Sequence, residues 1–407
     1  MSAPQGPEPS PRPPPGQARW LNRTVLGIGA ASLFSDVGHE MATTVLPTLV
    51  LAVGGTSAAL GIIEGVADGA ASAAKLVSGL YSDRLARRKP LAAAGYFLTA
   101  GGMASFALAT HTWHLLLGRS IGWLGRGART PVRNVLLTEA TTPQPYGRAF
   151  GLERSMDSAG AVLGPILALI LVAAIGVRPT LALTLVPGFL AALAILLLVR
   201  ERTHQPRPHQ KFWASLRTFP KTYRRFLLGV GVAGLGDFSK TLLILWATQA
   251  WTPRLGLAAA ARWAMVFYVG YNIVYTVSCS VAGALADRFS KPSVLAAGYL
   301  LAAVPALLLM LPSESFAKFA AVFALCGVYM GFWETVEGSA AAEFLPSEVR
   351  GLGFGVLATV NGLGDLISSA LVGVLWTVSP GAAMTAVMVV CIVGAALVSR
   401  SSAPVAA

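Results

Sequence analysis

Long apolar runs, separated by short polar breaks, follow one another along almost the whole chain. An α-helix needs about 20 such residues to cross a lipid bilayer. The period-2 alternation of membrane strands is absent, so we expect helices. We count twelve runs, at residues 23–52, 56–80, 91–110, 114–138, 149–174, 180–199, 226–249, 260–284, 293–311, 316–338, 351–378 and 381–399. The pattern therefore predicts an all-α membrane protein with twelve transmembrane helices.

A charged motif between two apolar runs occurs twice, and its two aspartates, Asp83 and Asp287, are offset by 204 residues in a chain of 407. A repeat at half-length is typical of transporters that are built from two related bundles. The first copy contains Gly79, Asp83, Arg84, Arg87 and Arg88, and the second contains Gly283, Asp287 and Arg288. We expect two pseudo-symmetric six-helix bundles, at residues 21–199 and 226–400.

The segments outside the bundles are polar. Residues 1–20 are rich in proline and predict a disordered tail, and residues 401–407 form a second short tail. Residues 200–225 form the longest connection, with Phe212, Trp213, Leu216 and Phe219 at helical spacing. We expect an amphipathic helix there, lying on the inner membrane face and joining the bundles.

Composition agrees with a membrane protein and explains the basic charge. Hydrophobic residues make up 55% of the chain, charged residues 12%, and the mean hydropathy is +0.64. The net charge of +13 does not indicate a nucleic-acid partner, because the tails and even-numbered connections hold 20 of the 31 Lys and Arg residues. This positive-inside asymmetry predicts an integral protein of the cell (inner or plasma) membrane, with both termini in the cytoplasm and basic residues near anionic lipids.

The runs also contain many ionisable side chains, each of which costs about 2.5–3.5 kcal/mol at the centre of a membrane helix. We expect them to line a shared aqueous pathway or to pair with one another. A static network of ion pairs that holds the helices together is the alternative. The candidates for a solute and proton pathway are Asp36, His39, Glu40, Glu64, Asp68, Arg119, Arg126, Arg129, Arg133, Asp237, Lys240, Glu334 and Glu337.

Within this set, Asp36, Glu40, Glu64 and Asp68 are the leading candidates for proton binding, with Arg119 as the modulating cation. A carboxylate among apolar groups binds its proton more tightly, and a nearby arginine opposes that effect. Asp36, His39 and Glu40 share one helix face, but one histidine and two acids make a thin metal-ligand set. We therefore expect no metal site and no cofactor other than a proton gradient.

The motif from Gly79 to Arg88 resembles the signature of the major facilitator superfamily between its second and third helices, and the motif at Gly283–Arg288 resembles its weaker echo in the second half. In the run at 149–174, the set Gly151, Gly160, Gly164 and Pro165 resembles a motif of proton-coupled exporters of that superfamily. The resemblance covers about residues 20–400. It implies a transporter fold in which helices 1, 4, 7 and 10 surround the central path.

Two contacts are implied by this resemblance. Asp83 is expected to engage the amino-terminal end of the eleventh helix, near Arg350, and to latch the inner face shut. The four arginines of the run at 114–138 are expected to face Glu334 and Glu337 across the path. The glycines and Pro165 are expected to bring the fifth helix close to a neighbour and to bend it.

We therefore expect a secondary active transporter that works by alternating access, as a monomeric proton-coupled exporter of small organic molecules or drugs. A proton-coupled importer or symporter of a small, anionic metabolite is the first alternative, since arginines suit carboxylate or phosphate. A membrane receptor or enzyme is a distant one. We find no nucleophile–base set and no phosphate loop, so we expect no enzyme.

Overall fold

The computed structural model describes residues 20–55, 57–201, 216–238 and 240–401. The predicted tail at 1–20 lies almost wholly outside these residues, and so do Phe212 and Trp213 of the predicted linker helix and residues 402–407.

Within the described residues the helices form twelve rods. The first six are α1 (Arg23–Ala52), α2 (Ser57–Ser82), α3 (Lys89–Ala104) continued by η1 (Ser105–Leu108), α4 (Thr112–Glu139), α5 (Tyr146–Ile175), and α6 (Val177–Leu183) continued by α7 (Leu185–Leu198). The other six are α9 (Lys221–Gly234) continued by α10 (Lys240–Leu255), α11 (Leu257–Arg288), α12 (Lys291–Leu301) continued by α13 (Ala303–Met310), α14 (Phe316–Phe344), α15 (Arg350–Val378) and α16 (Pro380–Ser399). The predicted all-α membrane fold is confirmed.

By length and composition, eight helical segments in the described part of the chain could cross a membrane. The helix α4 is not among them, and the reason is visible in its sequence. It carries Arg119, Arg126, Arg129 and Arg133 within Thr112–Glu139. These charges lower its hydropathy, and three of the four arginines are buried against the rest of the chain.

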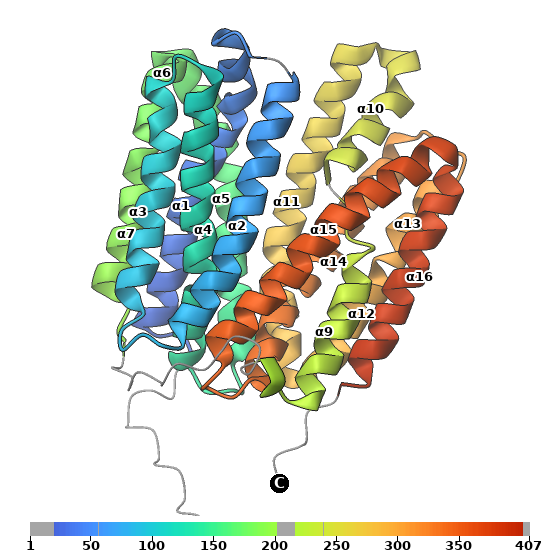
Figure 1. Cartoon of the computed structure of the whole chain (residues 1–407). Helices are drawn as coiled ribbons and strands as arrows, with labels where there is room; N and C mark the ends of the chain where they lie inside the picture. Colours follow the sequence, from blue (N-terminus) through green and yellow to red (C-terminus); the bar gives the residue numbers. More distant parts are fainter. Residues whose placement is uncertain (1–19, 56, 202–215, 239, 402–407) are drawn as a thin grey trace, which may run out of the picture.

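The rods form two groups that lie side by side, α1–α7 and α9–α16 (Figure 1). We call these groups the N half and the C half. The helix α1 begins and α16 ends at the same end of the molecule, which we call the terminal side. The halves meet at the terminal side and diverge towards the opposite end (Figure 1).

Two tight reversals at the far end depend on glycine. Gly176 separates α5 from α6 with φ +85°, and Gly256 separates α10 from α11 with φ +76°. A residue with a Cβ rarely adopts this left-handed conformation, whereas glycine does so without a steric penalty. The chain can therefore end one helix and begin the next within a single residue.

Candidate functional site

Asp83 lies at the end of α2 and caps the first turn of α15 in the other half. Its Oδ1 accepts a hydrogen bond from the Gly351 amide at 2.8 Å, and its Oδ2 accepts one from the Leu352 amide at 2.8 Å. The first amides of a helix have no partner within the helix, and a carboxylate there also interacts with the positive end of the helix dipole. The predicted contact between Asp83 and the eleventh helix is confirmed, and its role as a latch stays a prediction.

Asp287 makes the matching contact between α11 and α5. Its Oδ1 accepts a hydrogen bond from the Gly147 amide at 2.7 Å, and its Oδ2 accepts hydrogen bonds from the Arg148 amide at 3.1 Å and from Arg148 Nε at 2.7 Å. Each half therefore sends one aspartate to the first turn of a helix in the other half. We call these contacts the Asp83 latch and the Asp287 latch.

A second repeat, which our sequence reasoning missed, forms the receiving side of both latches. The segments Gly147-Arg-Ala-Phe150-Gly151 and Gly351-Leu-Gly-Phe354-Gly355 have the same pattern and the same offset of 204 residues as the aspartates. Phe150 and Phe354 contact one another, with ring centroids 6.1 Å apart. A comparison of each segment with the one 204 residues later would have revealed this repeat in the sequence.

Glycine allows the helix backbones to touch at both latches. A Cβ on Gly79 would lie 2.6 Å from the Gly351 carbonyl oxygen, and one on Gly151 would lie 2.6 Å from the Cys279 carbonyl oxygen. Gly283 meets the Gly147 carbonyl even more closely. Both crossings therefore need the missing side chain, and any larger residue would push the halves apart.

The remaining helix-5 motif residues pack against α1. A Cβ on Gly160 would lie 2.8 Å from the Asp36 Cβ, and one on Gly164 would lie 2.6 Å from the Glu40 Cβ. Pro165 lies inside α5. The prediction that these glycines bring the fifth helix close to a neighbour is confirmed, and the contacts place α5 directly behind two of the candidate acids.

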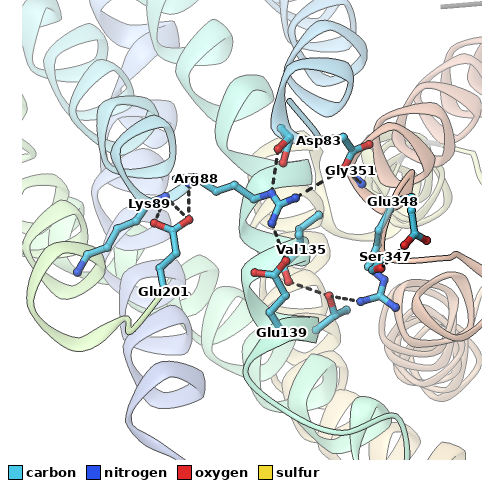
Figure 2. Close-up of polar contacts among 12 residues, drawn as sticks. Asp83, Arg88, Lys89, Val135, Glu139, Glu201, Ser347, Glu348 and Gly351 are labelled. Atoms are coloured by element: carbon cyan, nitrogen blue, oxygen red, sulfur yellow. Dashed lines mark hydrogen bonds and ion pairs between the residues drawn. The ribbon is translucent and has the colours of Figure 1, made fainter. Parts of the chain in front are cut away.

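Arg88 supports the Asp83 latch from the N half, and Figure 2 shows it between Asp83 and Glu139. Its guanidinium donates to the Ser82 carbonyl at 2.9 Å and to Glu139 at 2.6 Å, and lies 4.0 Å from Asp83. Glu201, which we did not predict, accepts hydrogen bonds from the Arg88 and Lys89 amides at the start of α3. These hydrogen bonds hold the segment after α7 against the start of α3, next to the repeated motif.

The other basic residues of the repeated motif lie towards solvent. Arg87 and Arg288 are exposed, and the Arg84 guanidinium lies 5.7 Å from the centre of the Tyr81 ring. These positions agree with a role in membrane topology rather than in the contact between the halves.

Three of the four arginines of α4 form ion pairs within the N half. Arg119 pairs with Glu64 at 2.8 Å and also donates to the Thr43 hydroxyl at 2.9 Å. Arg126 pairs with Asp36 at 3.1 Å. Two of the four leading proton candidates, Asp36 and Glu64, are thus neutralised by arginine in this conformation.

Arg133 and Arg129 are both buried within the N half. Arg133 pairs with Glu153 of α5 at 2.7 Å, and both side chains are almost fully buried. Arg129 is buried with its guanidinium 3.9 Å from the centre of the Tyr96 ring, and its Nε and Nη1 have no hydrogen-bond partner in the described part of the chain. A cation over an aromatic face replaces part of the hydration that burial removes.

The expectation that the α4 arginines face Glu334 and Glu337 is wrong. Glu334 instead pairs with Arg154 of α5 at 3.5 Å and accepts a hydrogen bond from the Tyr275 hydroxyl. The reason is packing: α5 contacts both α11 and α14 of the C half, which brings Arg154 within ion-pair distance of Glu334. Arg154 was not among our predicted site residues, although its charge within an apolar run was a signal.

The other two leading proton candidates have partners that are not arginine. Asp68 is exposed and accepts a hydrogen bond from the Trp123 indole at 2.6 Å. Glu40 lies 3.6 Å from His39, whose ring packs against Trp123 with centroids 4.4 Å apart. The predicted grouping of Asp36, His39, Glu40, Glu64 and Asp68 with the α4 arginines is confirmed as a spatial arrangement.

The C half carries a smaller set of interior charges. Lys240 of α10 lies 3.6 Å from Asp237, which also accepts a weak hydrogen bond from the Tyr329 hydroxyl at 3.5 Å. Glu337 of α14 accepts hydrogen bonds from Asn361 and from the Tyr299 hydroxyl. Asn361 and Tyr299 were not predicted, because neutral side chains attract no attention in an apolar run.

The contact between the halves has a definite extent. It runs along α5 from the Asp287 latch to Ser158, whose hydroxyl contacts that of Thr276, which is about 16 Å of helix. Just beyond it, interior charges keep access to solvent: the side chains of Glu40, Arg126 and Lys240 are 28%, 30% and 31% exposed. The halves are thus in contact on the terminal side, and three charged side chains beyond this contact are partly exposed.

The family model of the Major Facilitator Superfamily matches residues 28–369. The chain belongs to the major facilitator superfamily. It is therefore an integral membrane transporter of small molecules, and not an enzyme.

Similarity to individual proteins agrees with this assignment. An uncharacterized MFS-type transporter of Methanocaldococcus jannaschii is 28% identical over 381 residues, which cover 89% of this chain and 90% of that one. The multidrug resistance protein MdtH of Cronobacter sakazakii is 37% identical over 92 residues only, 23% of each chain. Among solved structures, the E. coli fucose:proton symporter FucP has a TM-score of 0.75 at 16% identity, covering 93% of this chain and 98% of its own.

Proposed function

We propose that this transporter is a monomeric proton-coupled antiporter of the cell membrane that exports small organic molecules, with both termini in the cytoplasm. The observation that carries the proposal is the set of acids and bases just beyond the contact between the halves. Asp68 is exposed there, Glu40, Arg126 and Lys240 are partly exposed, and Asp36 is buried against Arg126. A group that binds a proton for transport must reach water from one side at a time, and the contact between the halves on the terminal side supports this.

The placement of basic residues supports the orientation. Arg87, Arg88, Lys89 and Arg288 lie at the terminal side, beside the latches. Basic residues mark the cytoplasmic ends of transmembrane helices. The conformation described here is then closed to the cytoplasm and accessible from outside, and the Asp83 and Asp287 latches hold the inner face shut.

The partial similarity to MdtH, whose name describes multidrug resistance, supports export. The interior charges also limit the solute. An uncharged lipophilic molecule would have to displace water from Arg126 and Glu40 without replacing its hydrogen bonds, which is unfavourable. We therefore favour polar or charged organic molecules, which can pair with these groups.

Proteoliposomes with an imposed pH gradient test the proposal. An antiporter takes up its solute into vesicles that are acidic inside, because protons leave as the solute enters. We expect a panel of amphiphilic cations, zwitterions and carboxylates to include solutes with such uptake. Asp68→Asn should abolish gradient-driven uptake, because Asp68 is an exposed carboxylate at this level and the amide cannot bind a proton.

Glu314→Gln is the matched control, because Glu314 is exposed at the far end of the molecule, outside the charged interior. Both variants should keep the parent's melting temperature. Uptake that is indifferent to the gradient would reject proton antiport. Gradient-driven uptake that is equal in Asp68→Asn and the parent would reject Asp68 as a proton-binding group.

A symporter of a small anionic metabolite is the second candidate. The exposed Arg126 favours it, because a guanidinium can bind a carboxylate or phosphate through two parallel hydrogen bonds. The fold is also that of the fucose:proton symporter. In the same vesicles a symporter would accumulate its solute only under the opposite gradient, so the sign of the gradient separates the two candidates.

A further inference from the structure

We propose that Glu337 carries the coupled proton inside the C half, holding it while the terminal side is sealed and releasing it when that side opens. This inference rests on the proton coupling proposed above and adds a specific group to it. It depends on the surroundings of Glu337, which differ from those of every other acid described within the helices.

The Glu337 side chain lies between three helices and meets neutral partners. It is on α14 and the residue is 3% exposed. Asn361 Nδ2 of α15 donates to Oε1, and the Tyr299 hydroxyl of α12 donates to Oε2 at 3.4 Å. Neither partner carries a charge that could balance an ionised carboxylate.

The charged groups around Glu337 do not neutralise it. Glu334 on its own helix and Asp365 on α15 are both acidic. Arg154 of α5 is the nearby cation, but it lies within 3.7 Å of Glu153, Asp157 and Glu334. Tyr223 of α9 also lies near this site, and its hydroxyl donates a hydrogen bond to the Gly353 carbonyl.

An ionised carboxylate without a cation is costly in such a place. The effective penalty for burying an unpaired ion is several kcal/mol, even after the protein relaxes around it. Adding a proton removes the charge and most of this penalty. Glu337 therefore holds a proton in the conformation described here.

Comparison with the other acids isolates Glu337. Asp36 and Glu64 pair with arginines, and Asp68 and Asp365 are exposed. Among the carboxylates described within the helices, Glu337 alone combines burial with the absence of a basic partner in ion-pair distance. An intramembrane acid of this kind is expensive to keep unless it has a function.

Asn361 offers Glu337 both the donor and the acceptor that a change of protonation needs. As drawn, its Nδ2 donates to the carboxylate, whereas its buried Oδ1 has no hydrogen-bond partner in the described part of the chain. The two ends of an amide are assigned from such contacts, and a rotation exchanges them. With the amide turned, Oδ1 accepts a hydrogen bond from the protonated Glu337 oxygen, and Nδ2 takes the place that Oδ1 had.

The position of Asn361 connects this pair to the movement of the halves. Asn361 is half-buried on α15, next to Gly362, which faces Ser72 of α2 in the other half. Separation of α2 from α15 would admit water to Asn361 and then to Glu337 from the terminal side. The O–H bond of Glu337 breaks there, the proton passes to water, and the carboxylate is hydrated while that side stays open.

Infrared spectroscopy of the purified protein tests this without a substrate. A protonated carboxyl group has a C=O stretching band that ionised carboxylates lack. We expect the parent protein to keep such a band at alkaline pH, and Glu337→Gln to lose it. Glu343→Gln, in which the removed acid pairs with Lys291 at the terminal side, is the control and should keep the band.

The Asp83→Ala background adds a readout that a merely structural acid would not change. Opening of the terminal side should move the loss of the band to lower pH. A band that persists in Glu337→Gln overturns the inference. A band that is lost in Glu337→Gln but titrates identically with and without the Asp83 latch overturns the proposed release.

Transport separates this inference from the proposed function. If the parent shows gradient-driven uptake and Glu337→Gln abolishes it while the protein stays folded, both stand. If the Glu337 band titrates with latch opening but the parent moves no protons with any solute, proton antiport fails and the proton site remains. If Glu337→Gln retains full gradient-driven uptake, antiport stands and Glu337 is not its proton carrier.

Discussion

At the scale of single residues, the partner of each buried charge decides what it contributes. Arg133 and Glu153 are paired at 2.7 Å, with side chains 4% and 0% exposed. The Ser32 hydroxyl bonds to both of them. Such a pair contributes little net stability compared with apolar residues of the same size, but removal of one member leaves an unpaired buried charge.

We therefore expect Glu153→Gln to destabilise the protein by about 3–5 kcal/mol, because Arg133 loses its counter-charge. The double variant Arg133→Met with Glu153→Leu should be much less destabilised. Thermal unfolding in detergent measures both. Glu314→Gln is the control, because Glu314 is exposed at the far end of the molecule. Equal losses in the single and double variants would contradict this account.

At the scale of helices, the two latches are charge–dipole contacts between elements of different halves. Asp83 caps α15 and Asp287 caps α5, each with two backbone amides. A carboxylate at a helix amino terminus stabilises it by about 0.3–1 kcal/mol when exposed and by up to about 2 kcal/mol when partly buried. Two such contacts can bias an equilibrium between conformations without locking it.

Asp83→Ala and Asp287→Ala should each shift the protein towards the form that is open on the terminal side, by about tenfold for about 1.4 kcal/mol, and the double variant should shift it further. The measurement is the distance between spin labels at Arg87→Cys and Ser347→Cys, which are exposed on opposite halves. We expect a longer distance in the latch variants and no change in Glu314→Ala. Distances that match the parent in all variants would show that the latches do not hold the halves.

At the scale of the whole molecule, α1 begins and α16 ends on the side where the halves are in contact (Figure 1). The even number of rods requires this, and the basic residues beside the latches predict that this side is cytoplasmic. The described conformation would then accept solute or protons from outside.

Labelling of intact cells with a membrane-impermeant maleimide tests the orientation. Ser313→Cys, at the far end, should be labelled, and Ser347→Cys, at the terminal side, should be labelled only after the cells are opened. The three native cysteines, Cys279, Cys326 and Cys391, are buried and give little background. The reverse pattern would invert the topology and with it the proposed direction of transport.

The sequence by itself determined the number and type of the helices and the duplication, and its resemblance to the superfamily implied the contact of Asp83 with the eleventh helix. The spans follow from a local feature, because run length sets them. The contact also has a physical reason, because an aspartate can accept hydrogen bonds from the free amides at the start of a helix. The sequence also placed Asp36, Glu40, Glu64 and Asp68 beside the α4 arginines, because costly charges must gather away from lipid.

Only the tertiary structure decided which charges pair and which one stays alone. Glu334 and Glu337 differ by one helical turn, yet Glu334 meets Arg154 and Glu337 meets Asn361 and Tyr299. The neighbours of a side chain at this position come from α5, α12 and α15, and helix spacing along one element carries no information about the rotation of another. The physical reason is that ion pairing depends on distances of a few ångströms across helices, which packing sets after the spans have formed.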